Sequence, residues 1–238
     1  MGNALLSVAE AHERIANCVR PLPPQRRRLS ELLKLRLAED VVSRVDSPPF
    51  DKSQVDGYAI ATSDTSETLR ELELVTAGGV PRYAVRPGTT IRVMTGAPTP
   101  EGADAVVKWE DCHVEADGAI RNPAGSVKPD SCILRRGTAF HMGQTLIKAG
   151  RQIDPLDIAL LAEIGQAEAS VYPRPRVGVL PTGDELVAAH EPLGPGQIRN
   201  SNGPMLLAAL AATNMTPVDL GVGRDDPADL RAKISLGL

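Results

Sequence analysis

Proline and glycine occur throughout this chain and limit how long any helix can run. The 238 residues include 20 prolines and 21 glycines. Proline interrupts helices because it lacks an amide hydrogen, and glycine favours turns. Aromatic residues make up only 3% against 42% hydrophobic residues, so the cores must be aliphatic. The sequence predicts short elements joined by many turns, and its length is that of two or three domains.

The charge balance is mildly acidic and argues against nucleic-acid binding. There are 26 Lys and Arg residues against 30 Asp and Glu, a formal net charge of -4, whereas nucleic-acid-binding domains carry a basic face. The one basic run, Arg26–Arg28, is interpreted as a solvated surface. No stretch approaches the roughly 18 apolar residues of a membrane-spanning helix. Neither nucleic acid nor membrane is therefore expected as a partner.

The cysteines do not suggest a disulfide framework or a zinc site. Cys18, Cys112 and Cys132 are an odd number without a Cys-x-x-Cys motif, and the adjacent Cys112 and His113 fall short of four zinc ligands. We interpret the cysteines as reduced thiols of a cytoplasmic protein.

Two helices and a strand are expected before residue 50. Ser7 and Glu10 form a capping box at the start of the first helix. A second helix is expected near Ser30, where leucines between Leu29 and Leu37 suggest a helical face. From about Leu69 to Leu146, short alternating segments between Gly- and Pro-bearing turns predict a small β domain, a barrel or a sandwich.

Helical pattern returns at Asp154, the expected N-cap, with Pro155 in the first turn and Gly165 at the end. Its buried stripe is predicted to be Ile158, Leu161, Ala162 and Ile164.

The last part of the chain reads strand, helix, strand, helix. A continuous apolar strand, "RVGVL", suggests a parallel sheet buried on both faces. A helix with Ser201 or Asn202 near its cap, a second strand and a helix capped by Asp226 follow. This order is typical of a doubly wound α/β domain. Two strands are few for such a domain, so we expect it to be cut short.

Three polar stretches are candidates for chemistry. In "SPPFDKSQVDGYAI", Asp51 and Asp56 lie in one loop whose apolar residues would anchor it and leave the carboxylates free. In "MTGAP", Thr95 could offer amides and a hydroxyl to an anion, although a plain turn explains the small residues better.

The third stretch, "PTGDEL", follows a strand of the α/β domain, where such sheets bind ligands. Gly183 would allow close approach, Thr182 offers a hydroxyl, and Asp184 and Glu185 offer oxygens for Mg²⁺. From these residues alone, a solvated acidic turn and a metal site are equally compatible.

Four stretches follow one another along the chain in this order: "PPFDKSQVDGYA", "MTGAPTPEGADAVV", "TGDEL" and "GQIRNSNGPML". Through them the chain resembles the molybdopterin molybdenumtransferase family, which comprises the MoeA proteins and the E domain of gephyrin. The resemblance runs from about Leu22 to the last residue. It implies a multidomain α+β and α/β fold. The implied parts are an elongated intermediate, dimerising domain of residues 1–46 and 146–173, an inserted β domain of residues 47–145, and a truncated MogA-like α/β domain of residues 174–238.

The resemblance also implies an activity. Family members insert molybdate into adenylylated molybdopterin and release AMP with the help of Mg²⁺, as cytoplasmic homodimers that can meet other proteins of molybdenum cofactor synthesis. The alternative is a non-catalytic fragment or scaffold that dimerises and binds molybdopterin weakly or not at all. A generic nucleotide-binding module would need a phosphate loop, which the sequence lacks.

The site residues follow from the matching motifs. Asp51 is implied to face the α/β domain of a partner subunit. The implied catalytic residues are Asp51, Thr95 and Glu185, and the implied metal ligands are Asp51, Asp184 and Glu185. The implied cofactor contacts are Ser53, Gly96, Thr182, Gly183, Ser201 and Asn202.

The chain departs from the family pattern at two positions and at its end. Leu134 stands where the family usually has arginine, and Ala139 where it has aspartate. Losing an arginine removes a bidentate anion clamp. A later glycine-rich "SGGVSVG" loop of the family lies beyond Leu238. We therefore expect that these 238 residues alone do not complete molybdenum insertion.

Overall fold

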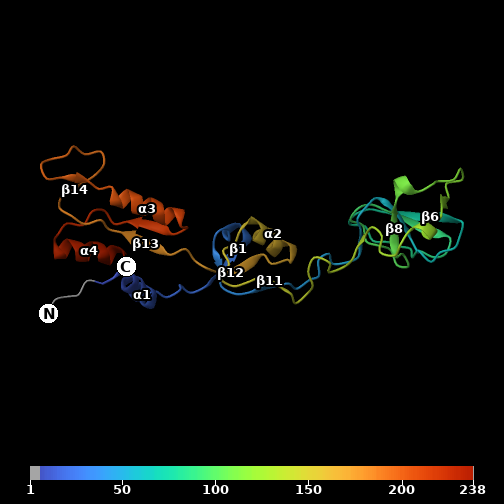
Figure 1. The fold of residues 1–238 in the computed structure, drawn as a ribbon, viewed down its shortest axis with the longest axis horizontal. Helices are drawn as coiled ribbons and strands as arrows, with labels where there is room; N and C mark the ends of the chain where they lie inside the picture. Colours follow the sequence, from blue (N-terminus) through green and yellow to red (C-terminus); the bar gives the residue numbers. More distant parts are fainter. Residues whose placement is uncertain (1–5, 238) are drawn as a thin grey trace. The chain divides into compact units, whose positions relative to one another are not determined.

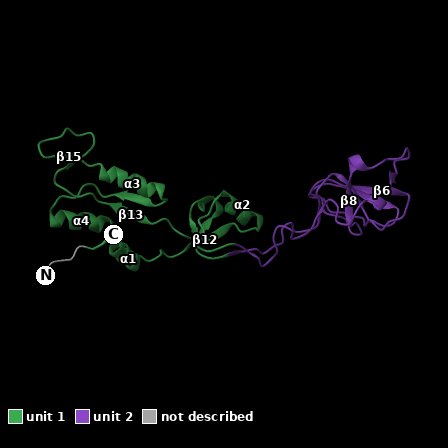
Figure 2. Cartoon of the chain, viewed as in Figure 1, with its two compact units in different colours: residues 1–40, 147–238 green, residues 41–146 purple. Residues whose placement is uncertain are grey.

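The structure is a computed structural model that describes residues 6–237, and the chain divides into two compact units (Figures 1 and 2). One unit combines Met1–Asp40 with Ile147–Leu238, and the other is Val41–Leu146. The finer division into three domains that the sequence suggests stays a prediction. Within residues 6–237, no helix is long and apolar enough to cross a membrane.

The first unit begins with helix α1 (Val8–Cys18), which confirms the predicted capping box. The hydroxyl of Ser7 accepts a hydrogen bond from the Glu10 amide, and the Glu10 carboxylate accepts from the Ser7 amide at 2.8 Å. None of the helix residues is buried, so its apolar side chains, such as Val8 and Ile15, are exposed.

The second predicted helix is wrong. Residues 25–37 instead form strand β1 (Gln25–Arg28), a 3-10 turn (Leu29–Glu31) and strand β2 (Arg36–Leu37). Both strands pair antiparallel with β12 (Glu168–Tyr172), which lies between them in a three-stranded sheet. The amides of Leu29 and Leu37 donate to Ala167 and Arg151, so long-range bonds replace helical ones. Lys34, with φ 64°, lies in the left-handed region and would break a helix.

Helix α2 (Pro155–Glu163) covers this sheet and begins as predicted. The Asp154 carboxylate accepts from the amides of Leu156 and Asp157, which completes a capping box. Leu161 and Ile164 are buried, as expected, but Ala162 is exposed because it lies on the outer face of the short helix.

The remainder of the first unit confirms the predicted strand, helix, strand, helix order. Strands β13 (Arg176–Val179) and β16 (Thr216–Asp219) pair in parallel, and helix α3 (Asn202–Ala212) packs against both. Helix α4 (Pro227–Gly237) follows, and strands β14 (Leu186–Val187) and β15 (Ile198–Arg199) form a small parallel pair.

Strand β13 is not buried on both faces, contrary to the prediction. Only Val179 is buried, while Arg176 and Gly178 are exposed. In the described part of the chain the sheet has only two strands, so little covers it.

The second unit contains a five-stranded sheet in the order β8 (Ala105–Lys108), β5 (Gly57–Ile60), β7 (Thr89–Val93), β6 (Thr68–Val75), β9 (Ile120–Arg121). Strands β6 and β7 are parallel and the other neighbours antiparallel. Ala59 and Val106 pack into one apolar cluster and Tyr58 and Val107 into another, so both faces of the sheet are buried. The short strands expected in this part of the chain are present, and their assignment to an inserted β domain stays a prediction. The outer strands of the sheet, β8 and β9, do not pair within the described residues, so the sheet is not a closed barrel.

Four further strands pair in twos: β4 (Lys52–Ser53) with β10 (Ile133–Leu134), and β3 (Val41–Val42) with β11 (Thr145–Ile147). The remaining 3-10 turns are Trp109–Asp111 and Ala124–Ser126. The β4–β10 pair joins the loop that holds Asp51 to the Arg135–Arg136 segment.

Candidate functional site

The candidate residues fall into two groups, one in each unit. The first, called here the Asp51 loop, is residues 51–56 with the facing residues 94–97 and 134–139. The second, called here the Glu185 turn, is residues 182–185 with the start of α3. The structure describes each group separately.

The carboxylate of Asp51 is held by two consecutive arginines. Its Oδ1 atom accepts from the Arg136 amide at 2.8 Å, and its Oδ2 atom forms an ion pair with the Arg135 guanidinium. The same guanidinium pairs with Asp130, and Arg136 Nε donates to Asp46 at 2.6 Å. The expectation that this carboxylate stays free is therefore wrong, because β4–β10 pairing brings the arginines to it.

These contacts fix the protonation state of Asp51. Burial opposes its charged form, but the hydrogen bonds from the Arg136 amide and the Arg135 guanidinium outweigh burial and lower the pKa of Asp51. The side chain is 35% exposed, so a ligand in solvent can still approach an ionised carboxylate.

Asp56, the second acid of the loop, binds Thr95. One oxygen, Oδ1, accepts from both the Thr95 amide at 2.7 Å and the Thr95 hydroxyl at 2.8 Å. Chiefly the amide bond, and then the hydroxyl bond, lowers the pKa of Asp56. Because the hydroxyl donates its proton to Asp56, the Thr95 oxygen has only lone pairs left to offer.

The backbone of the Thr95 turn is likewise occupied. The amide of Gly96 donates to the Ser53 carbonyl at 2.8 Å, and the amide of Ala97 donates to the Met94 carbonyl at 2.9 Å. Gly96 has φ 85°, which explains the glycine. The expectation that this turn offers amides and a hydroxyl proton to an anion is therefore wrong: it presents an oxygen acceptor.

Ser53 shapes the loop from inside. Its side chain is 1% exposed, and its hydroxyl donates to the Val55 carbonyl at 2.6 Å. Its expected contact with a cofactor stays a prediction.

The two departures from the family pattern lie beside this loop. Leu134 pairs with Lys52 in the β4–β10 register and is partly buried. Ala139 is exposed, and its amide donates to the Ser47 carbonyl at 2.9 Å. Arg136 remains as a cation between them, with a side chain that is 63% exposed.

The Glu185 turn follows the carboxyl end of β13. The Gly183 amide donates to the Gly223 carbonyl at 3.0 Å, which ties the turn to the segment after β16. Gly183 has φ 145°, a backbone conformation that favours glycine, whereas the Glu185 carboxylate that a Cβ would meet belongs to a flexible side chain that could move aside. Thr182, Asp184 and Glu185 are exposed, and Asp184 Oδ1 accepts from the Asp225 amide at 3.2 Å.

The start of α3 is capped by a residue that the sequence prediction passed over. Asn200 Oδ1 accepts from the Gly203 amide at 2.9 Å, whereas the Ser201 side chain makes no capping bond. Ser201 is the N-cap residue and Asn202 the first residue of α3, as expected, although neither supplies the capping hydrogen bond. Both are exposed, so their predicted role toward a ligand remains available.

The acids do not by themselves form a metal site. Within residues 6–237, no group of three or more His, Cys, Asp or Glu side chains is arranged to hold a metal ion. Asp51 fits a cation poorly because both its oxygens already bind arginines. Asp184 and Glu185 fit better, because Mg²⁺ commonly takes one or two carboxylates together with phosphate oxygens.

Sequence reasoning missed Arg135 and Arg136 as site residues, and it missed the link between Asp56 and Thr95. Asp56 was visible in the "VDGYA" motif, but its link to Thr95 spans 39 positions and depends on the pairing of β5 with β7. The arginines lie in "LRRG", and their place beside Asp51 depends on the long-range pairing of β4 with β10, which no local pattern reveals.

Comparison with known proteins covers nearly the whole chain. The family model "MoeA N-terminal region (domain I and II)" matches residues 6–165. A second model, "Probable molybdopterin binding domain", matches residues 178–238. Both groups of candidate residues lie inside these matched ranges.

Individual relatives agree with the models. A molybdopterin molybdenumtransferase of Staphylococcus aureus is 35% identical over 97% of this chain and 56% of its own length. One from Haemophilus influenzae is 37% identical over 88% of this chain and 52% of its own length. The crystal structure of a molybdopterin biosynthesis MoeA protein from Pyrococcus horikoshii is 31% identical with a TM-score of 0.86, over 98% of this chain and 61% of that one. The chain thus spans about half the length of the curated relatives it matches.

Proposed function

We propose that this chain, which belongs to the MoeA family and corresponds to its N-terminal portion, acts in molybdenum cofactor biosynthesis as part of a molybdopterin molybdenumtransferase. The proposed reaction inserts molybdenum from molybdate into adenylylated molybdopterin and releases AMP. The observation that carries the proposal is that both family models match, in order, over the residues that form the Asp51 loop and the Glu185 turn.

The Asp51 loop is proposed to orient the substrate. Among residues 6–237, the Arg136 guanidinium donates to Asp46 through Nε alone, and its other hydrogens can bind an oxyanion such as molybdate or phosphate. Asp51 holds the Arg136 amide and the Arg135 side chain in place, which fixes this segment before a ligand arrives. Thr95, whose proton is held by Asp56, accepts a hydrogen bond from an N–H or O–H group of the pterin.

The Glu185 turn is proposed to manage the negative charge of the substrate. Asp184 and Glu185 would hold Mg²⁺ together with phosphate oxygens of the ligand. The ion, when bound, would neutralise phosphate charge and stabilise AMP as a leaving group. Thr182 and Gly183 lie beside them for contact with the ligand, and Ser201 and Asn202 stand at the start of α3, where backbone amides favour anionic groups.

The experiment measures AMP release by the full-length protein that carries these residues. Adenylylated molybdopterin is supplied with and without molybdate and Mg²⁺, and molybdenum in the product is measured by mass spectrometry. We expect AMP and molybdenum-bearing product to appear together, and only with molybdate. AMP release that is the same without molybdate, with no molybdenum incorporated, would overturn the proposal.

We further propose that the protein is a cytoplasmic homodimer. The support is apolar side chains left exposed on the first unit: Leu33 is 43% exposed, Leu156 on α2 78%, and Val8 on α1 74%. A two-fold contact is the usual way to bury such faces. Light scattering should give twice the mass of one chain, and a mass equal to one chain at micromolar concentration would contradict the dimer.

A further inference from the structure

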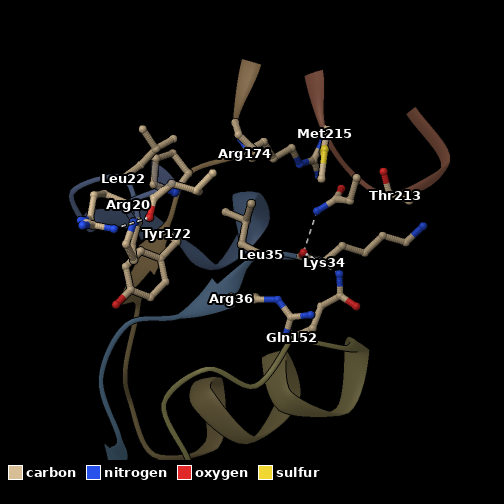
Figure 3. Close-up of a pocket in the computed structure, with 15 residues that line it drawn as sticks. Arg20, Leu22, Lys34, Leu35, Arg36, Gln152, Tyr172, Arg174, Thr213 and Met215 are labelled. Atoms are coloured by element: carbon tan, nitrogen blue, oxygen red, sulfur yellow. Dashed lines mark hydrogen bonds between the residues drawn. The ribbon is translucent and has the colours of Figure 1, made fainter. Parts of the chain in front are cut away.

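A pocket of about 550 Å³ lies within the unit formed by residues 1–40 and 147–238 (Figure 3). Segments far apart in the sequence wall it: residues 19–22 after α1, residues 34–36, and residues 172–175 with 213–215. This volume is in the range of small-molecule sites. Neither the Asp51 loop nor the Glu185 turn contributes to its walls.

Positive charge gathers in this pocket without negative charge to balance it. Arg20, Lys34, Arg36 and Arg174 line it, and no Asp or Glu does. Throughout residues 6–237, none of these four side chains forms an ion pair with a carboxylate. In a chain whose net charge is -4, such a cluster is unexpected on composition alone. All four residues are exposed, so solvent weakens their mutual repulsion, and an anion bound among them would remove what remains of it.

The arginines are anchored but not saturated. Arg36 Nη1 donates to the Gly150 carbonyl at 2.9 Å, and Arg174 Nη2 donates to the Leu33 carbonyl at 3.3 Å. A guanidinium has five N–H donors, so most of them remain for a ligand. The anchoring bonds limit the motion of both side chains, and less ordering is then required when an anion binds.

Lys34 supplies its charge from a strained position. Its φ of 64° is left-handed, where glycine or asparagine is more comfortable. Its carbonyl accepts from Gln152 Nε2 at 3.0 Å and from Asn214 Nδ2 at 2.7 Å, which holds the turn in this shape (Figure 3). Strained residues are concentrated at functional sites, and a lysine kept at such a position favours a use for its charge.

Apart from the cations and the polar residues Gln152, Thr213 and Asn214, the lining of the pocket is apolar. Leu22, Leu35, Met215 and the ring of Tyr172 line it beside the charged groups (Figure 3). A simple inorganic ion would leave these surfaces uncovered, whereas a ligand with a flat ring would cover them.

We propose that this pocket binds a small organic anion in which a phosphate or carboxylate group is joined to a flat apolar ring. The proposal does not rest on the function proposed above. The competing explanation is that the cations only complement the C-terminal end of α3, which closes at Thr213 beside the pocket.

Titration of this chain with 1-naphthyl phosphate, followed by fluorescence, tests the proposal. Two control compounds each contain one part of this probe: inorganic phosphate contains the anionic group, and 1-naphthol contains the flat ring. We expect naphthyl phosphate to bind at least about tenfold more tightly than either half. Absence of binding, or equal affinity for 1-naphthol, would overturn the proposal.

Variants locate the binding. Arg36→Gln and Arg174→Gln should each weaken naphthyl phosphate about tenfold, the loss typical of one charge-assisted hydrogen bond. The matched control Arg14→Gln removes an exposed arginine of α1 that lies outside the pocket and should change nothing. Binding that is equal in all three variants would show that the cations only serve α3.

Lys34→Asn separates binding from stability. Asparagine tolerates the left-handed backbone, so the melting temperature should hold or rise while affinity falls. Because Lys34 makes no side-chain hydrogen bond among the described residues, this variant also serves if an arginine variant does not fold.

Discussion

The Asp51 loop and the Glu185 turn differ in how far their own chain occupies them. In the loop, Asp51 binds two arginines and Asp56 binds Thr95. In the turn, Asp184 accepts one hydrogen bond from the Asp225 amide, and Glu185 is exposed. The loop is therefore arranged before any ligand arrives, whereas the turn gains its partners from the ligand.

This difference has an energetic consequence. Groups fixed in advance do not need to reorganise when charge develops in a reaction. Two adjacent exposed carboxylates repel each other and gain most when a cation or a donor is added. A substitution in the loop should thus affect folding and activity together, and one in the turn should affect activity alone.

The largest expected effect is on activity at the turn. Glu185→Gln in the full-length protein should slow AMP release on the order of 100-fold, because a charge that manages phosphate is lost. The melting temperature should stay within about 1 °C, since exposed side chains without partners contribute little to stability. Glu191→Gln, another exposed acid nearby, is the control and should leave both values unchanged. A marked fall in melting temperature would remove the contrast between turn and loop.

The next effect is on stability at the loop. Asp51→Ala leaves the Arg136 amide without its acceptor and removes one of the two carboxylates that pair with the Arg135 guanidinium. The change should cost about 1–2 kcal/mol of unfolding free energy after allowance for the exposure of Asp51. Urea unfolding measures this loss. Asp111→Ala, an exposed acid of the same unit, should stay near zero. Equal stability of wild type and Asp51→Ala would show that the arginine contacts are not used.

The smallest effect is the pH dependence of the loop. The pKa of Asp51 and that of Asp46 lie below the ordinary value, Asp46 mainly because it accepts from the Met142 amide. The two carboxylates contribute fully to the free energy of unfolding at pH values above their pKa in the unfolded chain, about 3.9. This contribution is lost as the pH falls through their lower pKa values in the folded protein. The urea concentration at the unfolding midpoint should therefore decrease as the pH is lowered from about 5 to about 3. The decrease should be less steep in the double variant that carries Asp51→Asn and Asp46→Asn. An unchanged slope would contradict this assignment.

Local signals predicted much of the fold. Neighbouring residues alone were enough to predict the helix caps at Ser7 and Asp154. They were also enough to predict the order of strand, helix, strand and helix after residue 175. The helix expected near Ser30 failed because amides such as that of Leu37 pair more than 100 positions away, with Arg151, which leucine spacing cannot reveal. Long-range pairing overrode local propensity there.

The site followed the same rule. Motifs placed Asp51, Thr95 and Glu185 in loops, because short polar runs after strands are visible in sequence. What each side chain touches was not visible: the Arg135 partner of Asp51 lies 84 positions away. The direction of the Thr95 hydroxyl could not be predicted either, since it depends on an acid brought close by the sheet.

A double-mutant cycle on Asp56 and Thr95 tests the preorganised loop most directly. AMP release is measured for the full-length wild type, Asp56→Asn, Thr95→Val and the double variant. If Asp56 acts only by fixing the Thr95 hydroxyl as an acceptor, each single change should cost about 10- to 100-fold and the double change no more than the larger single one. Losses that multiply in the double variant would show that the two residues act independently and would contradict the account.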